Sequence, residues 1–272
     1  MIGVGLIGCG AIGRELSRAI QSGEAGDTSL VALFDQIEGV AADLAKNIGD
    51  EIHGSDSIDE FLATKKLEIV VECASPDAAR AYAESVLLSG KDLLIMSSGA
   101  LTDPDLALRL TDLAVRQDRR VIIPSGALGG IDAISATKGR LEQVTLTTTK
   151  PPRGLKGAPG FVDWETQHIS KATTIFDGSA IDAVKLFPAN VNVAATLSLA
   201  GLGAQDTKVK VIADPNSKIN VHEVEAKGDF GTLKFRMELY PHERNPKTSF
   251  LAIISAIEAL RASCSPGIKI GT

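Results

Sequence analysis

Aromatic residues are scarce in this chain, and no strong positive charge or long apolar run compensates for them. Only 4% of the 272 residues are aromatic, with a single Trp, so a base-stacking surface for single-stranded nucleic acid is not expected. The net charge of −6 supplies no basic field for nucleic acid or an anionic membrane. No apolar run reaches the roughly 18 residues that span a bilayer, and the N-terminus lacks a basic signal-peptide region. These absences predict a cytoplasmic protein that binds neither nucleic acid nor membrane.

Cysteines are few, and their spacing argues against structural cross-links. The chain has three cysteines, Cys9, Cys73 and Cys264, without a CxxC pair. We therefore expect no disulfide framework and no metal site. A cysteine nucleophile is also unsupported, because Cys9 lies inside a glycine motif and Cys73 ends an apolar stretch. The remaining composition, 44% hydrophobic and 23% charged, is ordinary for one large or two modest globular domains.

The first motif is a glycine-rich turn between a predicted strand and a predicted helix. An apolar run ends in GCGAIG at 8–13, a GxGxxG pattern, and a helical pattern follows. Gly8 allows a tight turn, Gly10 removes the Cβ that would obstruct a pyrophosphate, and Gly13 lets helix and strand pack closely. The phosphates would lie at the helix N-terminus, near its free N–H groups. The predicted dinucleotide-binding residues of this motif are Gly8, Gly10, Ala11, Ile12 and Gly13.

Cofactor preference is predicted from Asp35, which ends the second apolar strand at 29–34 about 20 residues beyond the glycine motif. A carboxylate at this place can accept hydrogen bonds from both ribose hydroxyls and would repel a 2′-phosphate. We therefore expect NAD as the cofactor, with NADP as the alternative.

Strands and helices alternate through the first half of the chain. Apolar strand patterns at 67–73, 92–97 and 120–124 are separated by helical patterns, such as the one at 104–117 and the one that Pro76 would begin with Ser75 as its N-cap. This alternation predicts a parallel sheet covered on both faces, in a Rossmann NAD(P)-binding domain over residues 1–125. The loops that follow the strands would lie at the edge where such sheets bind ligands, although helix capping explains them equally well.

The second half has a different pattern. Strand patterns at 144–150, 208–213, 219–227 and 233–239 follow one another with few helices, which predicts an α+β domain on a mainly antiparallel sheet over 126–245. A final helix within 246–272, which Asn245-Pro246 would open, is expected to pack back on the first domain. The segment KPPRGLKGAPG at 150–160 is either a mobile lid or an exposed connection. The expected fold class is therefore α/β, with an N-terminal Rossmann domain and a second α+β domain.

Several longer motifs are more specific than GxGxxG. They occur in order along nearly the whole chain: SGALGGID at 125–132, FPANVNVAA at 187–195, NVHE at 220–223 and NPKTS at 245–249. Together with the glycine motif they resemble the L-aspartate dehydrogenase family. That family resembles homoserine dehydrogenase in plan, with a Rossmann domain followed by an α+β catalytic and dimerisation domain.

The resemblance implies an activity and three site residues. Members of the family oxidise L-aspartate with NAD or NADP to iminoaspartate, which hydrolyses to oxaloacetate and ammonia or feeds NAD biosynthesis. Carried over to this sequence, the NAD contacts fall on Ala127 and Asn192, and the catalytic histidine falls on His222. The segment at 151–171 looks longer than compact members need, so no role is inferred there. The open face of the predicted sheet suggests a homodimer.

His222 has two interpretations. It lies in an alternating strand on the face that Val224 and Ala226 share, which is typical of a histidine packed in a core. The chemistry favours catalysis, because hydride removal from an amino-acid Cα requires a neutral amine and imine hydrolysis requires an activated water. An imidazole with its ordinary pKa near 6.5 suits both steps as a general acid and base.

A dicarboxylate substrate also needs cations or backbone donors, since buried carboxylates without partners are costly. The candidates are Lys150, Lys185 and Lys247 and the backbone amides of residues 126–130, although each lysine could be a solvated surface charge. Asn190 and Asn192 share one side of an extended stretch, so Asn192 could bind the nicotinamide carboxamide while Asn190 caps the next helix, or the reverse. Asn190 is also a candidate for substrate binding.

Two other functions remain open on the sequence. One is a homoserine-dehydrogenase-like reductase of another amino-acid pathway, which would act on a carbonyl without releasing ammonia. The other is a non-catalytic dinucleotide-sensing protein, against which His222 and the polar NVN motif argue.

Overall fold

The computed structural model describes residues 1–188, 192–242 and 245–264, and at 245–248 it describes only the backbone. The described residues form two compact units, one within 1–124 and 253–264, the other within 125–252. Across the described ranges, no helix is long and apolar enough to cross a membrane.

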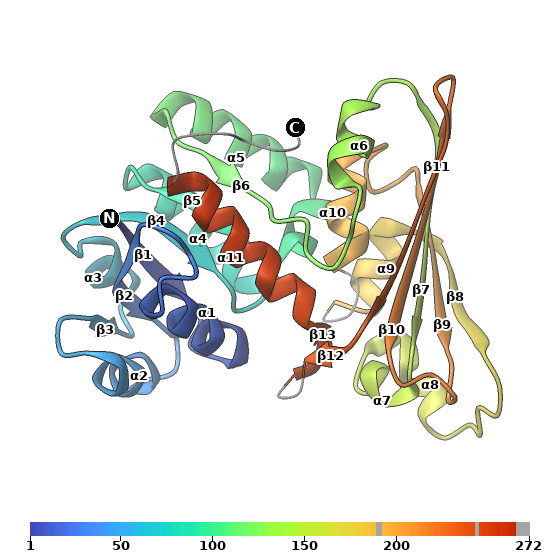
Figure 1. Cartoon of the computed structure of the whole chain (residues 1–272), viewed down its shortest axis with the longest axis horizontal. Coiled ribbons are helices and arrows are strands. Elements are labelled where there is room, and N and C mark those ends of the chain that lie inside the picture. The colour runs from blue at the N-terminus through green and yellow to red at the C-terminus, as the bar shows by residue number, and fades with distance from the viewer. Residues whose placement is uncertain (189–191, 243–244, 265–272) are drawn as a thin grey trace. The chain divides into compact units, whose positions relative to one another are not determined.

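The first unit is built on a six-stranded parallel sheet with the order β3-β2-β1-β4-β5-β6 (Figure 1). Neighbouring strands in it run parallel, and β1 lies at the centre between β2 and β4. The strands are β1 (Ile2–Ile7), β2 (Thr28–Phe34), β3 (His53–Ser55), β4 (Leu67–Glu72), β5 (Asp92–Ile95) and β6 (Val121–Ile122). This order is that of the Rossmann fold, so the predicted parallel-sheet domain is confirmed.

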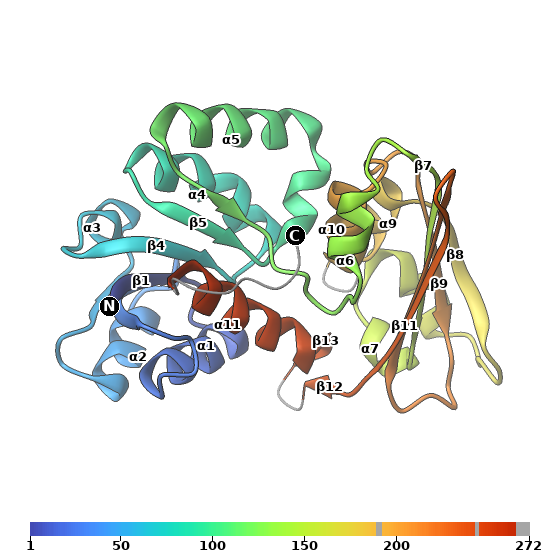
Figure 2. The ribbon, with the colours of Figure 1, turned by 45° about the horizontal axis from the view of Figure 1, so that its top comes forward.

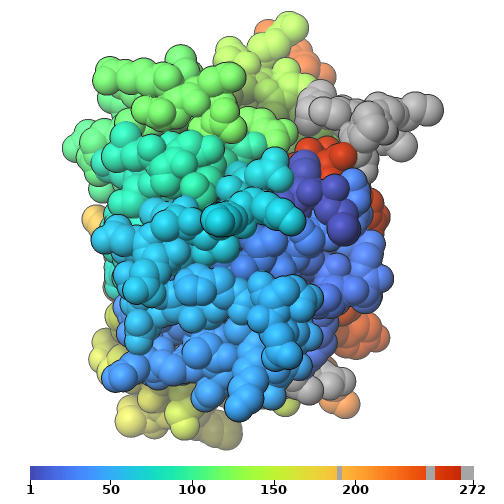
Figure 3. All heavy atoms as spheres, turned by 90° about the vertical axis from the view of Figure 1, so that its left-hand side faces the viewer, coloured from blue at the N-terminus to red at the C-terminus, as the bar shows by residue number. Residues whose placement is uncertain are grey.

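Helices cover both faces of this sheet. Figure 1 shows α1, α2 and α11 along one face and α4 and α5 along the other. Leu6 of β1 is buried in one apolar cluster with Leu16 of α1 and Leu260 of α11, so these helices seal one face of the sheet. The helices are α1 (Ala11–Gln21), α2 (Val40–Ile48), α3 (Ile58–Leu62), α4 (Pro76–Leu88), the 3-10 turn η1 (Ser98–Thr102), α5 (Pro104–Gln117) and α11 (Phe250–Cys264). Residues of the first third of the chain form the front surface in Figure 3.

The second unit contains a five-stranded sheet with the order β11-β10-β7-β9-β8. Its strands are β7 (Leu141–Lys150), β8 (Thr173–Ser179), β9 (Thr207–Ala213), β10 (Asn220–Gly228) and β11 (Gly231–Leu239). Three of the four pairings are antiparallel, whereas β7 and β9 run parallel. The predicted mainly antiparallel sheet is therefore confirmed, with the refinement that the sheet is mixed.

Helices cover one face of this second sheet (Figure 2). Alternate residues of the strands, for example Leu146, Val209 and Val224, are buried under them in one apolar core. The helices are α6 (Ile131–Ala136), α9 (Ala180–Leu186) and α10 (Asn192–Ala200). Strand β8 had no clear signal in the sequence, because Ile175 and Phe176 are its only apolar residues, and helix α9 was not predicted.

The segment after β7 is not a plain exposed connection, which was one of the two interpretations of its sequence. It forms α7 (Pro152–Leu155), the 3-10 turn η2 (Pro159–Phe161) and α8 (Val162–Glu165). Leu155, Ala158 and Phe161 are buried in the core of the second unit, so these three side chains anchor the segment.

The predicted start of the last helix is wrong. Residues Asn245–Ser249 form strand β13, which pairs antiparallel with β12 (Pro241–His242), and α11 begins only at Phe250. Asn-Pro is a common helix start, but here the backbone of the segment is engaged in the ladder with β12, which holds it extended.

Candidate active site

The glycine motif forms the turn between β1 and α1. Gly8 adopts φ +105°, a left-handed conformation that favours glycine, and a Cβ there would meet Ala74 at 2.8 Å. A Cβ on Gly13 would overlap the carbonyl oxygen of Gly8, whereas one on Gly10 would meet nothing within 4 Å. The two outer glycines thus allow close packing, and the middle one faces open space.

This turn fits a dinucleotide phosphate. Gly10 is the N-cap of α1, and within the described part of the chain no side chain caps this helix end and no acidic residue lies in its first turn. The first N–H groups of α1 therefore point to the space beside Gly10 with no negative charge from the first turn nearby, which is the arrangement that binds a pyrophosphate.

Asp35 follows β2 and fastens the same turn. Its Oδ2 accepts a hydrogen bond from the backbone N–H of Cys9 at 2.9 Å, and its Oδ1 accepts one from Ile37 at 3.1 Å. The carboxylate is half-buried beside the glycine turn. The place is that of a ribose-binding acid, and the same group also organises the turn.

A buried carboxylate that the sequence analysis missed lies at the carboxyl ends of β4 and β5. Glu72 accepts four hydrogen bonds, from the N–H groups of Ala74, Ser75 and Ser97 and from Ser97 Oγ, at 2.8 to 3.1 Å. Burial raises the pKa of its carboxyl, against the opposing effect of these donors. Glu72 thus joins the two loops after β4 and β5. In the sequence, the signal that could have identified it was an acidic residue at the end of an apolar strand.

In the second unit, polar side chains gather at one corner of the sheet face that carries the core. The ladder pairs His222 of β10 with Thr148 of β7, and Thr148 Oγ1 lies 3.1 Å from His222 Nδ1. Both are buried, at 0% and 1% exposure. Lys150 and Asn220, each two residues away on its strand, share this face and are also buried. We refer to these four side chains as the β7–β10 polar cluster.

Burial shapes the protonation of this cluster. It lowers the pKa of Lys150 to about 8. Burial, and secondly the charge of Lys150, lower the pKa of His222 to about 3. The imidazole is therefore neutral near pH 7, and its basicity depends on the charge that Lys150 carries.

The loop with Ala127 packs against the same region of the second unit. Ala127 is 5% exposed, and Gly130, at φ +75°, faces the ring of Phe235 so closely that a Cβ would overlap it. A Cβ on Gly129 would lie 3.8 Å from Sδ of Met237, which is the ladder partner of His222. Glycines let this loop approach β11 beside the polar cluster.

The asparagine motif is only partly described. Asn192 is the first residue of α10, so at that position the expected extended stretch is wrong. The backbone N–H of Asn192 therefore points out of the helix terminus and not toward a neighbouring strand. Asn190 lies outside the described residues, as does the side chain of Lys247, whose backbone belongs to β13.

Other candidate nucleophiles and bases are less suitable. His53 and His168 are exposed, and His242 stacks on Phe250 with ring centroids 6.0 Å apart. Burial raises the pKa of the Cys9 thiol to about 12 and that of Cys73 well above its usual value, so neither is a thiolate. Within the described ranges, no three His, Cys, Asp or Glu side chains form a metal-binding group.

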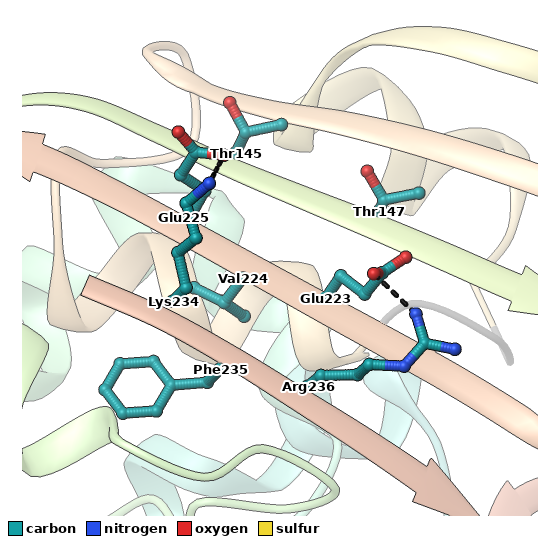
Figure 4. A pocket seen from close by; sticks show the side chains of 8 residues that line it. All are labelled: Thr145, Thr147, Glu223, Val224, Glu225, Lys234, Phe235 and Arg236. Atoms are coloured by element: carbon teal, nitrogen blue, oxygen red, sulfur yellow. Dashed lines mark hydrogen bonds and ion pairs between the residues drawn. The ribbon is translucent and has the colours of Figure 1, made fainter. Parts of the chain in front are cut away.

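A shallow open pocket of about 380 Å³ lies on the opposite face of the second sheet (Figure 4). Thr147, Glu223 and Arg236 line it, and Arg236 forms an ion pair with Glu223 at 2.6 Å. Because side chains alternate along a strand, Glu223 points away from the face that carries His222. This pocket is therefore separate from the β7–β10 polar cluster.

Family models match both units. Residues 8–124 match the model described as homoserine dehydrogenase, NAD binding domain, and residues 132–263 match aspartate dehydrogenase, C-terminal. Over the full length of both chains, the sequence is 46% identical to the L-aspartate dehydrogenase of Methanosarcina barkeri. It is 41% identical to that of Nitrosopumilus maritimus over 99% of each chain.

A solved structure resembles the whole chain. The crystal structure of aspartate dehydrogenase from Thermotoga maritima matches with a TM-score of 0.76 and 30% identity over 99% of each chain. GenD2 of gentamicin biosynthesis, solved with NAD, matches with a TM-score of 0.53 at 13% identity, a likeness of fold alone.

Proposed function

Because the chain belongs to the aspartate dehydrogenase family, we propose that it oxidises L-aspartate to iminoaspartate, which hydrolyses to oxaloacetate and ammonia or feeds NAD biosynthesis. The resemblance seen in the sequence is thereby confirmed, as is an NAD-binding Rossmann domain at the N-terminus. The observation that carries the proposal is the buried pair of His222 and Thr148 with Lys150 beside it, within the part that matches the C-terminal family model.

We assign cofactor binding to the glycine turn, Asp35, Ala127 and Asn192. The open space at Gly10 and the uncapped start of α1 support phosphate binding there. The negative charge of Asp35 favours NAD over NADP. When bound, NAD supplies the nicotinamide ring that accepts the hydride from the substrate Cα.

We assign general acid and base catalysis to His222. In the oxidation, the substrate ammonium must lose a proton before hydride leaves Cα, and water must be activated for imine hydrolysis. Burial, and secondly the charge of Lys150, hold the pKa of the free imidazole low. A substrate carboxylate next to Lys150 would offset that positive charge and raise the pKa of His222, so the base becomes stronger when the substrate is bound.

Lys150 is the substrate-binding cation we favour. It is 2% exposed, and burial disfavours its charged form. A carboxylate of the substrate would stabilise the ammonium form and so bind preferentially at this position. Asn190 and Lys247 are the further residues we assign to substrate binding, on the basis of the family motifs that contain them.

We propose a homodimer through the open face of the second sheet. This face carries side chains of both signs, including Glu223, Glu225 and Arg236, and is therefore self-complementary in charge (Figure 4). Sedimentation should give the mass of a dimer, and Thr147→Arg, which adds a bulky charge to this face, should shift it toward monomer.

We also propose a cytoplasmic location, in keeping with three free thiols.

The activity is tested by the ammonia dependence of NADH oxidation. The purified protein should oxidise NADH with oxaloacetate only when ammonia is present, and should reduce NAD with L-aspartate. Oxidation of NADH by a carbonyl substrate without ammonia would favour a homoserine-dehydrogenase-like reductase. NAD binding without turnover of any amino or keto acid would favour a dinucleotide sensor.

A further inference from the structure

Asn220, the first residue of β10, carries a buried acceptor that the proposed mechanism does not use. Its side chain is 0% exposed, and its Nδ2 donates to Ser249 Oγ at 3.2 Å. Its Oδ1 is buried and has no hydrogen-bond partner within the described part of the chain. Buried carbonyl oxygens of side chains are nearly always hydrogen-bonded, so this atom lacks a donor.

The position of Asn220 connects it with the substrate site. It lies two residues before His222 on the same face of β10. Val221 pairs with Thr149, so one further step in the antiparallel register puts Asn220 opposite Lys150. The bond to Ser249 holds the amide and turns Oδ1 away from that hydroxyl. The unused acceptor therefore belongs to the β7–β10 polar cluster.

The side chains of the cluster differ in which groups of a substrate they can bind. The Lys150 ammonium only donates hydrogen bonds and suits a carboxylate. His222 is the proposed acid and base, and the Thr148 hydroxyl is engaged with His222 Nδ1. An amide oxygen only accepts. Among the groups of L-aspartate, only the amino group offers N–H donors, so Asn220 Oδ1 complements that group.

We propose that Asn220 is a specificity-determining residue, whose Oδ1 accepts a hydrogen bond from the amino group of the substrate and so distinguishes an amino dicarboxylate from a plain one. The inference rests on the proposed function, because it assumes that aspartate binds at the β7–β10 polar cluster. The proposal predicts that the enzyme distinguishes ligands by their amino group, in addition to binding their carboxylates through cations.

Two ligands that differ only by this amine provide the test. Calorimetry on the enzyme saturated with NADH, so that aspartate cannot turn over, compares the dissociation constants of L-aspartate and succinate. The wild type should bind L-aspartate on the order of 10- to 100-fold more tightly, the effect of a hydrogen bond to a charged donor. Equal affinities in the wild type would overturn the proposal without any variant.

Variants separate this role from a structural one. Asn220→Leu and Asn220→Ala should reduce the ratio of the two affinities toward one, mainly by weakening L-aspartate. Ser249→Ala, which removes the partner of Nδ2 but not the acceptor, should keep most of the ratio. If the Asn220 variants lose both ligands equally, the residue contacts a carboxylate or supports the fold, and the proposal is wrong.

Failure of the Asn220 proposal and failure of the proposed function give different results. A wild type without ammonia-dependent turnover would reject the dehydrogenase assignment, whatever the two affinities. Normal turnover with equal affinities for L-aspartate and succinate would leave that assignment intact and reject only the role of Asn220.

Discussion

The hydroxyl of Thr148 lies 3.1 Å from Nδ1 of His222, directly across the ladder that joins β7 and β10. Because both side chains are buried, this contact orients the imidazole from the neighbouring strand. One ring nitrogen is thus engaged by the protein, and the proposed function requires the other, Nε2, to face the substrate. If His222 transfers protons through Nε2, Thr148 must accept the hydrogen bond from Nδ1–H.

Thr148→Val should therefore impair catalysis more than binding. It keeps the shape of the side chain but leaves Nδ1–H buried without an acceptor, which favours the tautomer with its proton on Nε2. We expect kcat to fall on the order of 10- to 100-fold with little change in the KM for L-aspartate, since only part of the acid–base contribution is lost. Thr148→Ser, which retains the hydroxyl, should recover most of kcat. Nitrogen NMR of the ring should show the change of tautomer, and an unchanged kcat and tautomer in the valine variant would contradict this role.

His222→Asn should separate catalysis from packing. Turnover should fall on the order of 10²–10⁴-fold, the usual share of acid–base catalysis, while the Kd for NAD hardly changes. The low-pH limb of kcat/KM should disappear, and in the wild type it should lie below the ordinary 6.5, because the pKa of the free imidazole is lowered to about 3. Near-normal turnover with a lowered Tm would identify His222 as a packing residue instead.

Loss of the His222 imidazole should also change acid stability. Its pKa is lower in the folded than in the unfolded protein, so the unfolded state binds more protons between about pH 6.5 and 3. The wild type should therefore lose stability as the pH falls through this window. Urea unfolding of wild type and His222→Asn at several pH values should show a smaller loss in the variant.

Asp35→Ala should weaken NAD relative to NADP by about 1–3 kcal/mol, the cost of a lost charged hydrogen bond. The substitution also removes the acceptor of Cys9 N–H, so both cofactors should bind somewhat less well. Asp35→Asn provides the control, because it removes the charge yet can still accept from Cys9. The ratio of kcat/KM for the two cofactors is the measurement. An unchanged ratio in both variants would remove Asp35 from cofactor selection.

Lys150 should make stability rise with pH in the alkaline range. Its pKa is lowered from 10.5 to about 8 by burial, so between these values the unfolded state binds more protons than the folded one. Stability is therefore lower below about pH 8 and is regained toward pH 10.5. Lys150→Met should flatten this dependence and stabilise the protein at pH 7 by up to about 3 kcal/mol, while aspartate binding is lost.

Urea unfolding from pH 7 to 10.5 tests this expectation. Lys185→Met is the matched control, because the Lys185 side chain is 69% exposed and carries no comparable burial cost. If the wild type and Lys150→Met have parallel pH profiles, Lys150 is not a buried cation of lowered pKa in solution.

Much of the first unit was predictable because local signals there agree with the tertiary structure. The GxGxxG turn, the capping Ser75 with Pro76 and the apolar strands each report a conformation that their own residues favour. Ser75 Oγ does accept from Ala78 N–H, as the pattern predicted. Helix α5 covers the predicted residues, Pro104–Gln117. In this part of the chain, propensity, periodicity and packing favour the same structure.

The second unit was less predictable because its elements depend on partners distant in sequence. Asn245–Ser249 carries a helix-start signal, yet its pairing with β12 makes it a strand. The contact of His222 with Thr148 joins residues 74 positions apart, and no local pattern encodes it. Glu72 and Asn220 were likewise missed, because their roles arise from loops and strands that meet only in the folded chain.

The sequence by itself determined the chemistry available to this protein: a glycine turn for a dinucleotide, an acid at the end of the second strand, and His222 and Lys150 in a strand-rich second half. Tertiary structure alone decided how those groups behave. Burial makes His222 neutral and lowers the pKa of Lys150, and the register of β7 against β10 puts them on one face with Thr148 and Asn220. The reason is physical: residue type sets which protons and charges exist, whereas desolvation and neighbours across the ladder set their energies.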